Sequence, residues 1–286
     1  MNVATSLNIV LKGRPFDLAT PLIMAIVNAT DDSFYSMSRN AGTDQLKIRI
    51  DEAVAQGADI LDIGGCSTRP GSTPVTEDEE QERIFRAFSL VRSIAGGVPT
   101  SVDTFRASVA RLAVNDFGCD IINDISAFTL DAELLPTVVQ LQRPYILTHS
   151  GGIALSDDII SPDDTPEDKF LASVLQFFAR KTDQLRSAGF DNDIIIDPGF
   201  GFAKNLHQNY SLLGNLSLLR CFHEPILAGL SRKSMIYRPL GLTSEQALNG
   251  TSVLNILALN NGANILRVHD VAEAVQVRQL YELTHS

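Results

Sequence analysis

Eight short apolar runs, each followed by a longer stretch, recur along the chain and constrain its fold more than any other feature. The runs are PLIMAIVN, ADILDIG, PTSVDTF, CDIINDIS, PYILTHS, DIIIDPG, EPILAGLS and ANILRVHD. Their apolar residues are nearly continuous, which is typical of parallel strands that are covered on both faces. Stretches between them, such as TDQLKIRIDEAVAQG and RASVARLAVNDFG, have helical spacing and end in glycine. The alternation predicts repeated strand–helix units.

Eight such units in a chain of 286 residues amount to about 36 residues each, the size expected of a TIM (β/α)8 barrel. We therefore expect one domain over residues 1–286. The first 20 residues precede the first strand and carry alternating apolar positions at Leu7, Ile9 and Leu11. This alternation predicts a short N-terminal hairpin that caps the bottom of the barrel.

Charge and cysteine content exclude several classes of protein. The formal charge of −11, from 23 Lys and Arg against 34 Asp and Glu, argues against a nucleic-acid partner. Because no apolar run reaches the length of a membrane span and no signal-peptide pattern opens the chain, we expect no membrane partner. Cys66, Cys119 and Cys221 are widely spaced and form no CxxC pair, which favours the reducing cytoplasm.

Polar side chains follow every predicted strand, and the carboxyl ends of the strands are where TIM barrels carry their chemistry. The residues are Asn28, Arg69, Asp103, Asn123, His149, Asp197, Ser231, Lys233, Arg267 and His269. Taken singly, a loop Asn or Asp is more often a turn or cap residue. Because eight strand ends meet at one barrel mouth, the whole set predicts a binding site.

Within this set, Asp103, Asn123, Asp197 and Lys233 are expected to lie deep in the barrel. Burying two carboxylates, an amide and an ammonium is costly without partners, so they either pair with each other or bind a flat polar ligand. In the second case the ligand is a heterocycle. A carboxylate accepts two parallel N–H bonds from an aminopyrimidinone edge, an amide donates and accepts, and an ammonium donates to a ring carbonyl or nitrogen.

A shallower set comprises Asn28, Arg69, Arg267 and His269, because the eighth strand of a closed barrel lies beside the first. Arginine and histidine donate to phosphate, and an amide oxygen suits a hydrated divalent ion. The set resembles a diphosphate site with Mg²⁺, which prefers few protein ligands together with phosphate oxygens and water. The alternative is that Arg267 pairs with Asp270 at the surface.

Seven motifs together resemble one known family. They are IVNATDDSF, GADILDIGGCSTRPGS, SVDTFRASVA, DIINDIS, IIIDPGFGFAKN, LAGLSRKSMI and ILRVHDV, in the order and spacing of dihydropteroate synthase, from about Pro21 to Val271. The resemblance implies a TIM-barrel transferase of folate biosynthesis, usually a homodimer. Such an enzyme makes 7,8-dihydropteroate and diphosphate from 6-hydroxymethyl-7,8-dihydropterin diphosphate and p-aminobenzoate. Sulfonamides compete at its p-aminobenzoate site.

The resemblance also implies a role for each matching residue. The pterin would contact Asp103, Asn123, Asp197, Phe202, Gly229 and Lys233. The diphosphate would contact Asn28, Thr68, Arg69, Arg267 and His269, with Asn28 as the metal ligand. The p-aminobenzoate site would be bounded by Phe34, Thr68, Arg69, Pro70 and Ser231. Catalysis would fall to Asp103, Lys233, Arg267 and His269.

Four positions depart from the family pattern. Family members commonly have Pro at the position of Asp31, Glu at that of Cys66, and Met at those of Thr148 and Ser150. Cys66 has no obvious base partner in the sequence and is not expected to act as a nucleophile. Two other functions stay open: a pterin-dependent methyltransferase of the same barrel superfamily, and a catalytically weak paralogue that serves as a binding partner.

Overall fold

The predicted strand–helix units form an eight-stranded parallel sheet. The computed structural model describes residues 7–29, 39–66, 75–150 and 165–285, without the side chains of residues 39–41. The strands of the sheet are β3 (Leu22–Asn28), β4 (Ile60–Gly64), β5 (Thr100–Asp103), β6 (Ile121–Asp124), β7 (Tyr145–Thr148), β8 (Ile194–Asp197), β9 (Leu227–Ala228) and β10 (Ile265–Val268). Each of the eight predicted apolar runs contains one of them, so the sequence prediction of the strands is confirmed.

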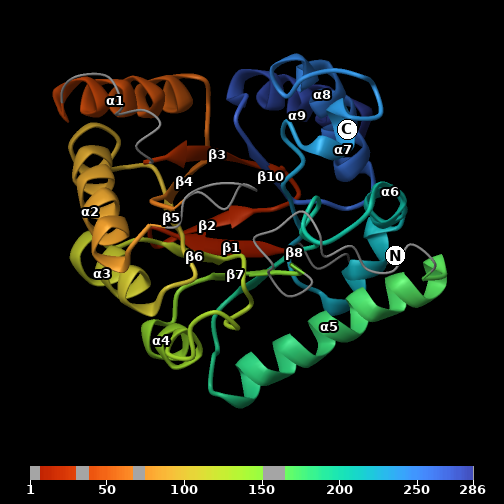
Figure 1. The fold of residues 1–286 in the computed structure, drawn as a ribbon, viewed down its shortest axis with the longest axis horizontal. Helices are drawn as coiled ribbons and strands as arrows, with labels where there is room; N and C mark the ends of the chain where they lie inside the picture. Colours follow the sequence, from red (N-terminus) through yellow and green to blue (C-terminus); the bar gives the residue numbers. More distant parts are fainter. Residues whose placement is uncertain (1–6, 30–38, 67–74, 151–164, 286) are drawn as a thin grey trace.

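The sheet curls until its two edges meet. The strand order is β8-β7-β6-β5-β4-β3-β10-β9, which leaves β8 and β9 at the edges. A parallel bridge joins Ile196 of β8 to Ile226, and the Ile196 amide donates to the Pro225 carbonyl at 2.8 Å. The strands therefore enclose a barrel whose carboxyl ends all open at one mouth, as predicted (Figure 1).

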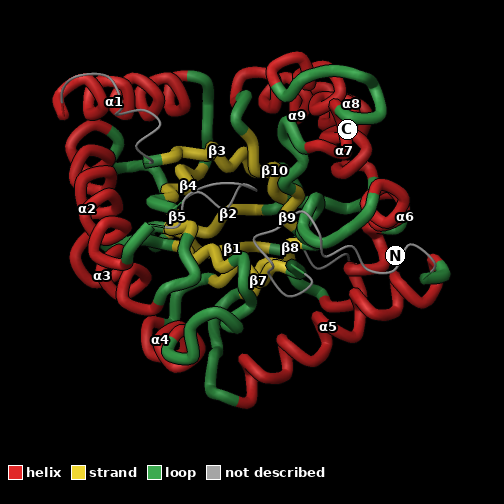
Figure 2. The backbone as a smooth tube through the Cα atoms, viewed as in Figure 1, coloured by secondary structure: helices red, strands yellow, loops and turns green. Residues whose placement is uncertain are grey.

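Helices surround the strands (Figure 2). They are α1 (Arg39–Ala55), α2 (Glu77–Ile94), α3 (Ala107–Phe117), α4 (Leu134–Leu141), α5 (Glu167–Ser187), α6 (Leu206–Gly214), α7 (Ser234–Tyr237), α8 (Leu248–Asn260) and α9 (Val271–His285), with 3-10 turns η2 (Leu216–Phe222) and η3 (Glu245–Ala247). Outward-facing strand residues such as Ile23, Ala25 and Val27 pack with buried helix residues in one large apolar core. This packing explains the continuous apolar runs, because both faces of each strand are buried.

Local signals account for the ends of several helices. The Thr76 hydroxyl accepts a hydrogen bond from the Glu79 amide at 3.3 Å, so Thr76 caps the N-terminus of α2 as its spacing predicts. Helix α3 ends at Gly118, whose φ of 68° is costly for residues with a side chain. Gly118 thereby ends α3 three residues before β6, on the side away from the barrel mouth.

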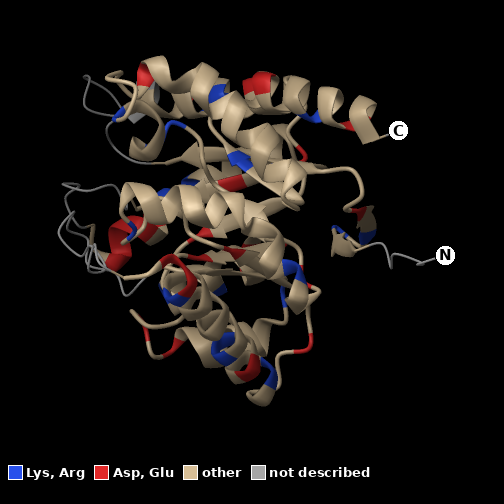
Figure 3. Ribbon diagram, turned by 90° about the vertical axis from the view of Figure 1, so that its right-hand side faces the viewer, with Lys and Arg blue, Asp and Glu red and all other residues tan. Residues whose placement is uncertain are grey.

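The N-terminal hairpin closes the opposite end of the barrel. Strands β1 (Asn8–Leu11) and β2 (Arg14–Asp17) pair antiparallel, with Lys12 and Gly13 in the turn. Ile9 and Leu11 share an apolar cluster with inward-facing residues of seven barrel strands. The hairpin therefore caps the barrel bottom as predicted, and Figure 3 shows it at the right-hand end, apart from the helices.

Acidic and basic residues are interspersed along the helices in Figure 3. This distribution agrees with the net negative charge of the chain. Among the described residues, none of the helices combines the length and the apolar character that crossing a bilayer requires.

Candidate active site

A polar ring lines the barrel directly above its apolar plug. In four strands an apolar residue of the inner cluster is followed two positions later by a charged or amide side chain on the same face. The pairs are Ile60 and Asp62, Ile121 and Asn123, Ile195 and Asp197, and Ile265 and Arg267. Because the strands are parallel and in register, the second members point into the barrel nearer its mouth. Four strands therefore deliver polar groups to one enclosed space.

Arg267 joins this ring together. Its Nε donates to Asp62 Oδ2 at 2.6 Å, and its Nη2 donates to Asp103 Oδ2 at 2.5 Å. Asn123 Nδ2 donates to the same Asp62 oxygen at 3.1 Å. One guanidinium thus connects strands β10, β4 and β5, and an amide from β6 completes the network. Sequence analysis placed Arg267 at the rim beside the phosphate site, whereas its side chain reaches down between two carboxylates.

Asp62 is a site residue that the sequence analysis missed. It is wholly buried, and its Oδ1 has no hydrogen-bond partner among the described residues. A signal was present, because Asp62 is the one charged residue inside the apolar strand ILDIG, and burying a carboxylate without a partner is costly. A charged residue in a strand that is covered on both faces should have been assigned to the interior of the barrel.

Within the network, the pKa is raised both for a carboxyl group, that of Asp103, and for a guanidinium, that of Arg267. Burial raises the pKa of Asp103 to about 7, against the lowering effect of Arg267, while Asp62 and Glu80 add repulsion. Burial lowers the pKa of Arg267, but Asp62 and Asp103 outweigh this effect and raise it above its usual value. Arg267 therefore stays charged, whereas Asp103 titrates near neutral pH.

Asp197 and Lys233 form the opposite side of the ring. Burial raises the pKa of Asp197, although the charge of Lys233 lowers it, and Oδ1 accepts from the Gly199 amide at 2.8 Å. Burial likewise lowers the pKa of Lys233 to about 8. The Lys233 ammonium donates to the Phe200 carbonyl and lies 5.0 Å from the centre of the Phe202 ring. A carboxylate, an ammonium and an aromatic face therefore border the same space.

Gly229 keeps that space open. It continues strand β9, and a Cβ atom at this position would lie 3.8 Å from Lys233 Nζ and 4.0 Å from Arg267 Cβ. A larger side chain here would fill the gap between the two cations. The residues predicted to shape the deep pocket are thus brought together: Asp103, Asn123, Asp197, Phe202, Gly229 and Lys233.

A second group lies toward the mouth. The Ser231 hydroxyl accepts from the His269 amide at 3.2 Å and lies 3.0 Å from His269 Nδ1. His269 is exposed, and Asn28 is half-buried at the carboxyl end of β3, in register with Gly64. Arg267 lies within β10 and His269 directly follows it, so Arg267 lies deeper in the barrel and His269 lies nearer the mouth.

Asp270 does not pair with Arg267, so that alternative was wrong. Its two carboxylate oxygens accept from Arg232, from Nε at 2.9 Å and from Nη2 at 2.7 Å. This bidentate pair ties the turn before α7 to the start of α9. Arg232 carries a φ of 55°, and the ion pair holds the turn that presents Ser231 and Lys233 to the barrel.

Four predicted site residues, Phe34, Thr68, Arg69 and Pro70, lie outside the described residues, as does the departure at Asp31. The flanks of the segment that contains Thr68, Arg69 and Pro70 are described.

Arginines hold both of these flanks. Arg83 Nη1 donates to the Gly65 carbonyl at 3.0 Å, and Arg106 Nη2 donates to the Val75 carbonyl at 2.7 Å. The buried Glu80 binds Arg106 in turn. Cys66 lies beside this cluster, where burial, followed by the charge of Glu80, raises the pKa of its thiol. A thiol with a raised pKa is a poor nucleophile, in agreement with the prediction for Cys66.

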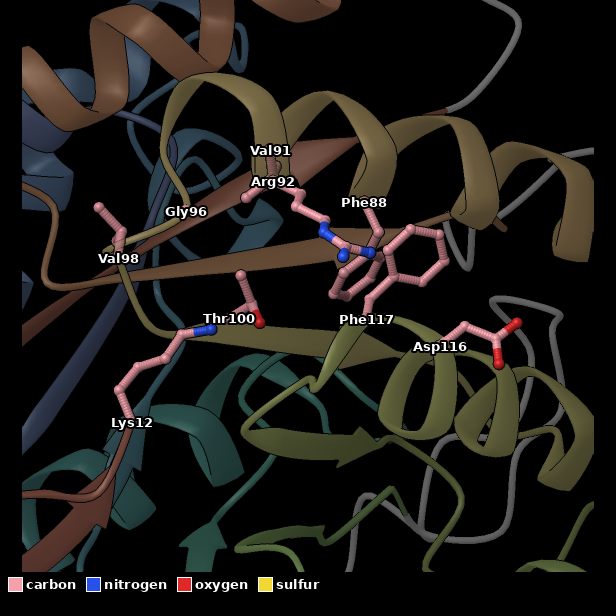
Figure 4. Close-up of a pocket in the computed structure, with 9 residues that line it drawn as sticks. All are labelled: Lys12, Phe88, Val91, Arg92, Gly96, Val98, Thr100, Asp116 and Phe117. Carbon is pink, nitrogen blue, oxygen red and sulfur yellow. The ribbon is translucent and has the colours of Figure 1, made fainter.

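One cavity lies at the other end of the barrel. Its volume is about 340 Å³, and it is bounded by the hairpin, α2 and α3. Figure 4 shows Lys12 and Arg92 reaching in from different elements beside Phe88 and Phe117. Lys12 lies 3.5 Å from Asp120, so this cation already has a carboxylate partner. The cavity contains none of the ring residues and is not the candidate site.

Comparison with known proteins agrees with this geometry. The family described as pterin binding enzyme matches residues 24–269. A dihydropteroate synthase of Haemophilus influenzae is 36% identical over 273 residues, covering 94% of this chain and 95% of the relative. A Yersinia pestis dihydropteroate synthase solved with a sulfonamide drug superposes with a TM-score of 0.87 at 32% identity, covering 98% of this chain and 99% of that one. A Xanthomonas albilineans dihydropteroate synthase solved with 4-aminobenzoic acid gives 0.85 at 35% identity and 99% coverage of both chains.

Proposed function

The chain belongs to the pterin binding enzymes and, among them, to the dihydropteroate synthases, and from this premise we propose how its own residues carry out the reaction. The enzyme is a transferase of folate biosynthesis. It condenses 6-hydroxymethyl-7,8-dihydropterin diphosphate with p-aminobenzoate and gives 7,8-dihydropteroate and diphosphate. The observation that carries the residue roles is the ring of Asp62, Asp103, Asn123, Asp197 and Arg267 inside the barrel, of which Asp62, Asn123 and Asp197 are buried.

The pterin ring binds inside this ring of polar groups. Asp197 accepts two parallel N–H bonds from the aminopyrimidinone edge, for which its Oδ2 and the second lone pair of Oδ1 are suited. Asn123 supplies an amide that donates and accepts, and Lys233 donates to a ring carbonyl or nitrogen. Phe202 provides a flat wall, since its ring already lies 5.0 Å from the Lys233 ammonium. The burial of Asn123 and Asp197 supports a polar ligand as their missing partner.

Asp62 is proposed as a positioning residue for the ring. Its Oδ2 binds both Arg267 and Asn123, so one carboxylate fixes the orientation of a cation and of an amide. With Nε and Nη2 held by carboxylates, the remaining Arg267 nitrogen, Nη1, forms no hydrogen bond to another described residue. That nitrogen is the one left to reach a substrate anion at the mouth.

The diphosphate lies above the pterin, toward Asn28, Arg267 and His269. Arg267 Nη1 and the exposed His269 donate to its oxygens, together with Thr68 and Arg69 from the segment outside the described residues. Donors that stabilise charge developing on a leaving group typically contribute about 3 to 4 kcal/mol each to the barrier. Positive groups near one mouth act locally, because the Debye length is about 8 Å at physiological salt.

The residues present suit a Mg²⁺ ion held mostly by substrate and water. The described part of the chain holds no cluster of three or more His, Cys, Asp or Glu side chains that would bind a metal by itself. Asn28 offers one neutral oxygen at the carboxyl end of β3, beside Gly64, which has no side chain to crowd it. Bound there, Mg²⁺ would neutralise part of the diphosphate charge.

The chemistry needs no nucleophile from the protein. The bond between the pterin methylene carbon and the diphosphate oxygen breaks, and its electron pair leaves with the diphosphate. The arylamine nitrogen then gives its lone pair to that carbon and releases a proton to water. Asp103, in its ionised form, stabilises positive charge that spreads over the dihydropterin, and Lys233 orients the ring.

The p-aminobenzoate site lies between the mouth and the segments outside the described residues. Of its proposed residues Ser231 is described, and its hydroxyl is bound to His269, which links the two substrate sites. Phe34, Thr68, Arg69 and Pro70 would complete the site. Sulfonamides are proposed to compete there, as the sulfonamide complex of the Yersinia pestis relative suggests.

Assembly and location are also proposals. Val253 and Leu257 lie one turn apart on α8 and are 49% and 42% exposed, and Leu240 and Leu242 on the preceding loop are exposed as well. Such an apolar surface supports a homodimer of single-domain chains that buries it. The free cysteines in the described residues support a reducing, cytoplasmic setting.

An assay of diphosphate release tests the proposed function. We expect release to require p-aminobenzoate, the pterin diphosphate and Mg²⁺ together. Asp197→Asn should slow it by about 10²–10³, whereas Asp193→Asn, at the other end of the same strand, should leave it within about threefold. Methyl transfer in place of diphosphate release would favour the methyltransferase alternative. Binding of the pterin without turnover would favour the weak paralogue.

A further inference from the structure

Lys204 is a half-buried cation that the proposed mechanism does not use. Its ammonium donates to three backbone carbonyls: to Gly199 at 2.8 Å, to His149 at 2.9 Å and to Phe202 at 3.1 Å. An ammonium has three N–H donors, so every donor of Lys204 is engaged by the backbone. Lys204 is therefore unavailable to a substrate. Its function depends on the backbone segments that its ammonium joins.

The three carbonyls come from two neighbouring strand ends at the barrel mouth. His149 follows β7 directly, while Gly199 and Phe202 belong to the turn after β8. This turn is irregular, with positive φ at Gly199, Gly201 and Ala203. It packs so tightly on β7 that a Cβ at Gly199 would lie 2.2 Å from the His149 oxygen.

Carbonyl oxygens that converge on one point repel each other unless a cation lies between them. The Lys204 ammonium supplies that charge in the way that a monovalent cation does in a cage of carbonyls. Burial lowers the pKa of Lys204 to about 7, against the attraction of Asp197, while the nearby Lys233 lowers it further. Without the ammonium, three buried acceptors would lose their donor.

The turn that Lys204 holds also carries the pterin-binding groups on this side of the ring. The Gly199 amide donates to Asp197 Oδ1 at 2.8 Å. Lys233 binds the Phe200 carbonyl and lies over the Phe202 ring. Displacing the turn would therefore move the partners of both Asp197 and Lys233, although Lys204 touches neither through a hydrogen bond in the described structure.

We propose that Lys204 is a positioning residue for the pterin substrate, which locks the turn after β8 onto the end of β7 and so sets the orientation of Asp197, Phe202 and Lys233. The inference rests on the proposed function, because it assumes that these three residues bind the pterin. It assigns Lys204 no contact with either substrate. Its removal should therefore affect pterin binding more than p-aminobenzoate binding.

Lys204→Met tests the proposal, with Lys181→Met as a matched control. Lys181 also donates from its ammonium to a carbonyl, that of Ala127 at 2.9 Å, but on a loop that carries no ring residue. For Lys204→Met we expect the dissociation constant of 6-hydroxymethyl-7,8-dihydropterin diphosphate, measured by calorimetry, to rise about 10- to 100-fold, as misplaced binding groups typically do. The KM for p-aminobenzoate, at saturating pterin, should stay within about twofold. Lys181→Met should leave both constants within about twofold.

Chemical rescue distinguishes positioning from general destabilisation. In Lys204→Ala, ammonium ions should occupy the carbonyl cage and recover part of the lost pterin affinity, whereas choline at equal ionic strength should not. If Lys204→Met does not fold, the same measurements are made on Lys204→Gln, which keeps two N–H donors without the charge. Unchanged pterin affinity, or an equal loss for both substrates, in a folded variant would overturn the proposal.

The wild-type enzyme separates this outcome from failure of the proposed function. If the wild-type protein does not bind the pterin diphosphate, the proposed function fails. If the wild-type protein and Lys204→Met bind it equally well, the function stands and the positioning role is wrong.

Discussion

The inside of the barrel has two layers that differ in chemistry, although β4, β6, β8 and β10 contribute to both. The lower layer consists of Met24, Ile60, Ile121, Ile146, Ile195, Leu227 and Ile265, together with Ile9 and Leu11 of the hairpin. The upper layer consists of Asp62, Asp103, Asn123, Asp197 and Arg267. Consecutive residues on one face of a strand are about 7 Å apart, so a single step along each strand separates the two layers.

The comparison shows that stability and ligand binding depend on different residues of the barrel strands. Contacts in the lower layer are apolar and non-directional, so they stabilise the fold whatever the ligand. Groups in the upper layer are polar and directional, and their burial is costly until they are paired or bound to a ligand. Substitutions two residues apart in one strand should therefore change different properties of the protein.

The largest effect is expected from Arg267→Met in the upper layer. The variant leaves Asp62 and Asp103 without their shared cation, and breaking a buried ion pair typically costs about 3–5 kcal/mol of folding free energy. Turnover should fall by on the order of 10³, because the variant also loses a donor to the leaving group. Steady-state kinetics and urea unfolding measure the two losses.

Ile265→Val, two residues earlier in the same strand, is the control for Arg267. It should cost about 1 kcal/mol and leave turnover unchanged. Activity of Arg267→Met within threefold of wild type would remove Arg267 from the catalytic set.

The next effect, on stability alone, is expected from Ile195→Ala in the lower layer. Ile195 is wholly buried, and truncating such a side chain leaves a cavity that typically costs about 2–5 kcal/mol. The kcat/KM of the folded protein should stay within about threefold, because no polar group of the upper layer loses a partner. Urea unfolding and kinetics at low temperature test this pair of outcomes. A large loss of activity in the folded variant would show that the two layers are not independent.

A smaller effect is expected from pH. Asp103 acts as a carboxylate, and its pKa lies near 7, so kcat/KM for the pterin substrate should rise with pH through about 7. Lys233 acts as an ammonium with a pKa near 8, so kcat/KM should fall above that value. Below about pH 7 the fall should approach tenfold per pH unit.

Two variants check the assignment of the pH profile. Asp103→Asn should abolish the fall in kcat/KM at low pH. Ile195→Val should keep the falls at both low and high pH. If kcat/KM still falls at low pH in Asp103→Asn, the titration of a group other than Asp103 causes that fall. Asp62, Glu80 and Arg267 face Asp103 and set its pKa, so a changed fall at low pH in an Asp62 variant would also be expected.

The smallest effect is expected at the base of the lower layer, in Lys12→Met. The Lys12 ammonium lies 3.5 Å from Asp120, but the side chain is 31% exposed, and pairs of this kind typically contribute about 0–1 kcal/mol. The hairpin should stay docked through Ile9 and Leu11, with activity unchanged. A loss above about 2 kcal/mol in thermal unfolding would mean that the ion pair, and not the apolar plug, holds the hairpin.

Sequence reasoning predicted the barrel and the gathering of its deep residues because both depend on position along the strands. Asp103, Asn123 and Asp197 each end or nearly end a strand, and parallel strands place such residues at one mouth. The hairpin was predictable from the alternation of Ile9 and Leu11. Thr76 was predictable as a helix cap from its three-residue spacing to Glu79.

The same reasoning failed where partners had to be assigned. Asp62 lies two residues before the end of β4 and was passed over as part of an apolar run. The alternative that Arg267 pairs with Asp270 was wrong, because Arg232 binds Asp270 while Arg267 binds Asp62 and Asp103. The contact of Arg267 with the diphosphate stays a prediction. Phe34, Thr68, Arg69 and Pro70 lie outside the described residues and stay predictions.

The sequence by itself determined the repeating strand–helix pattern, because apolar spacing, capping residues and glycine stops act over a few neighbouring residues. The tertiary structure alone decided which buried charges pair, since Asp62 and Arg267 are 205 residues apart in the chain. They meet because the strand order of the sheet sets β10 and β4 on either side of β3. Electrostatic pairing depends on distance through space, and that distance exists only once the barrel has closed.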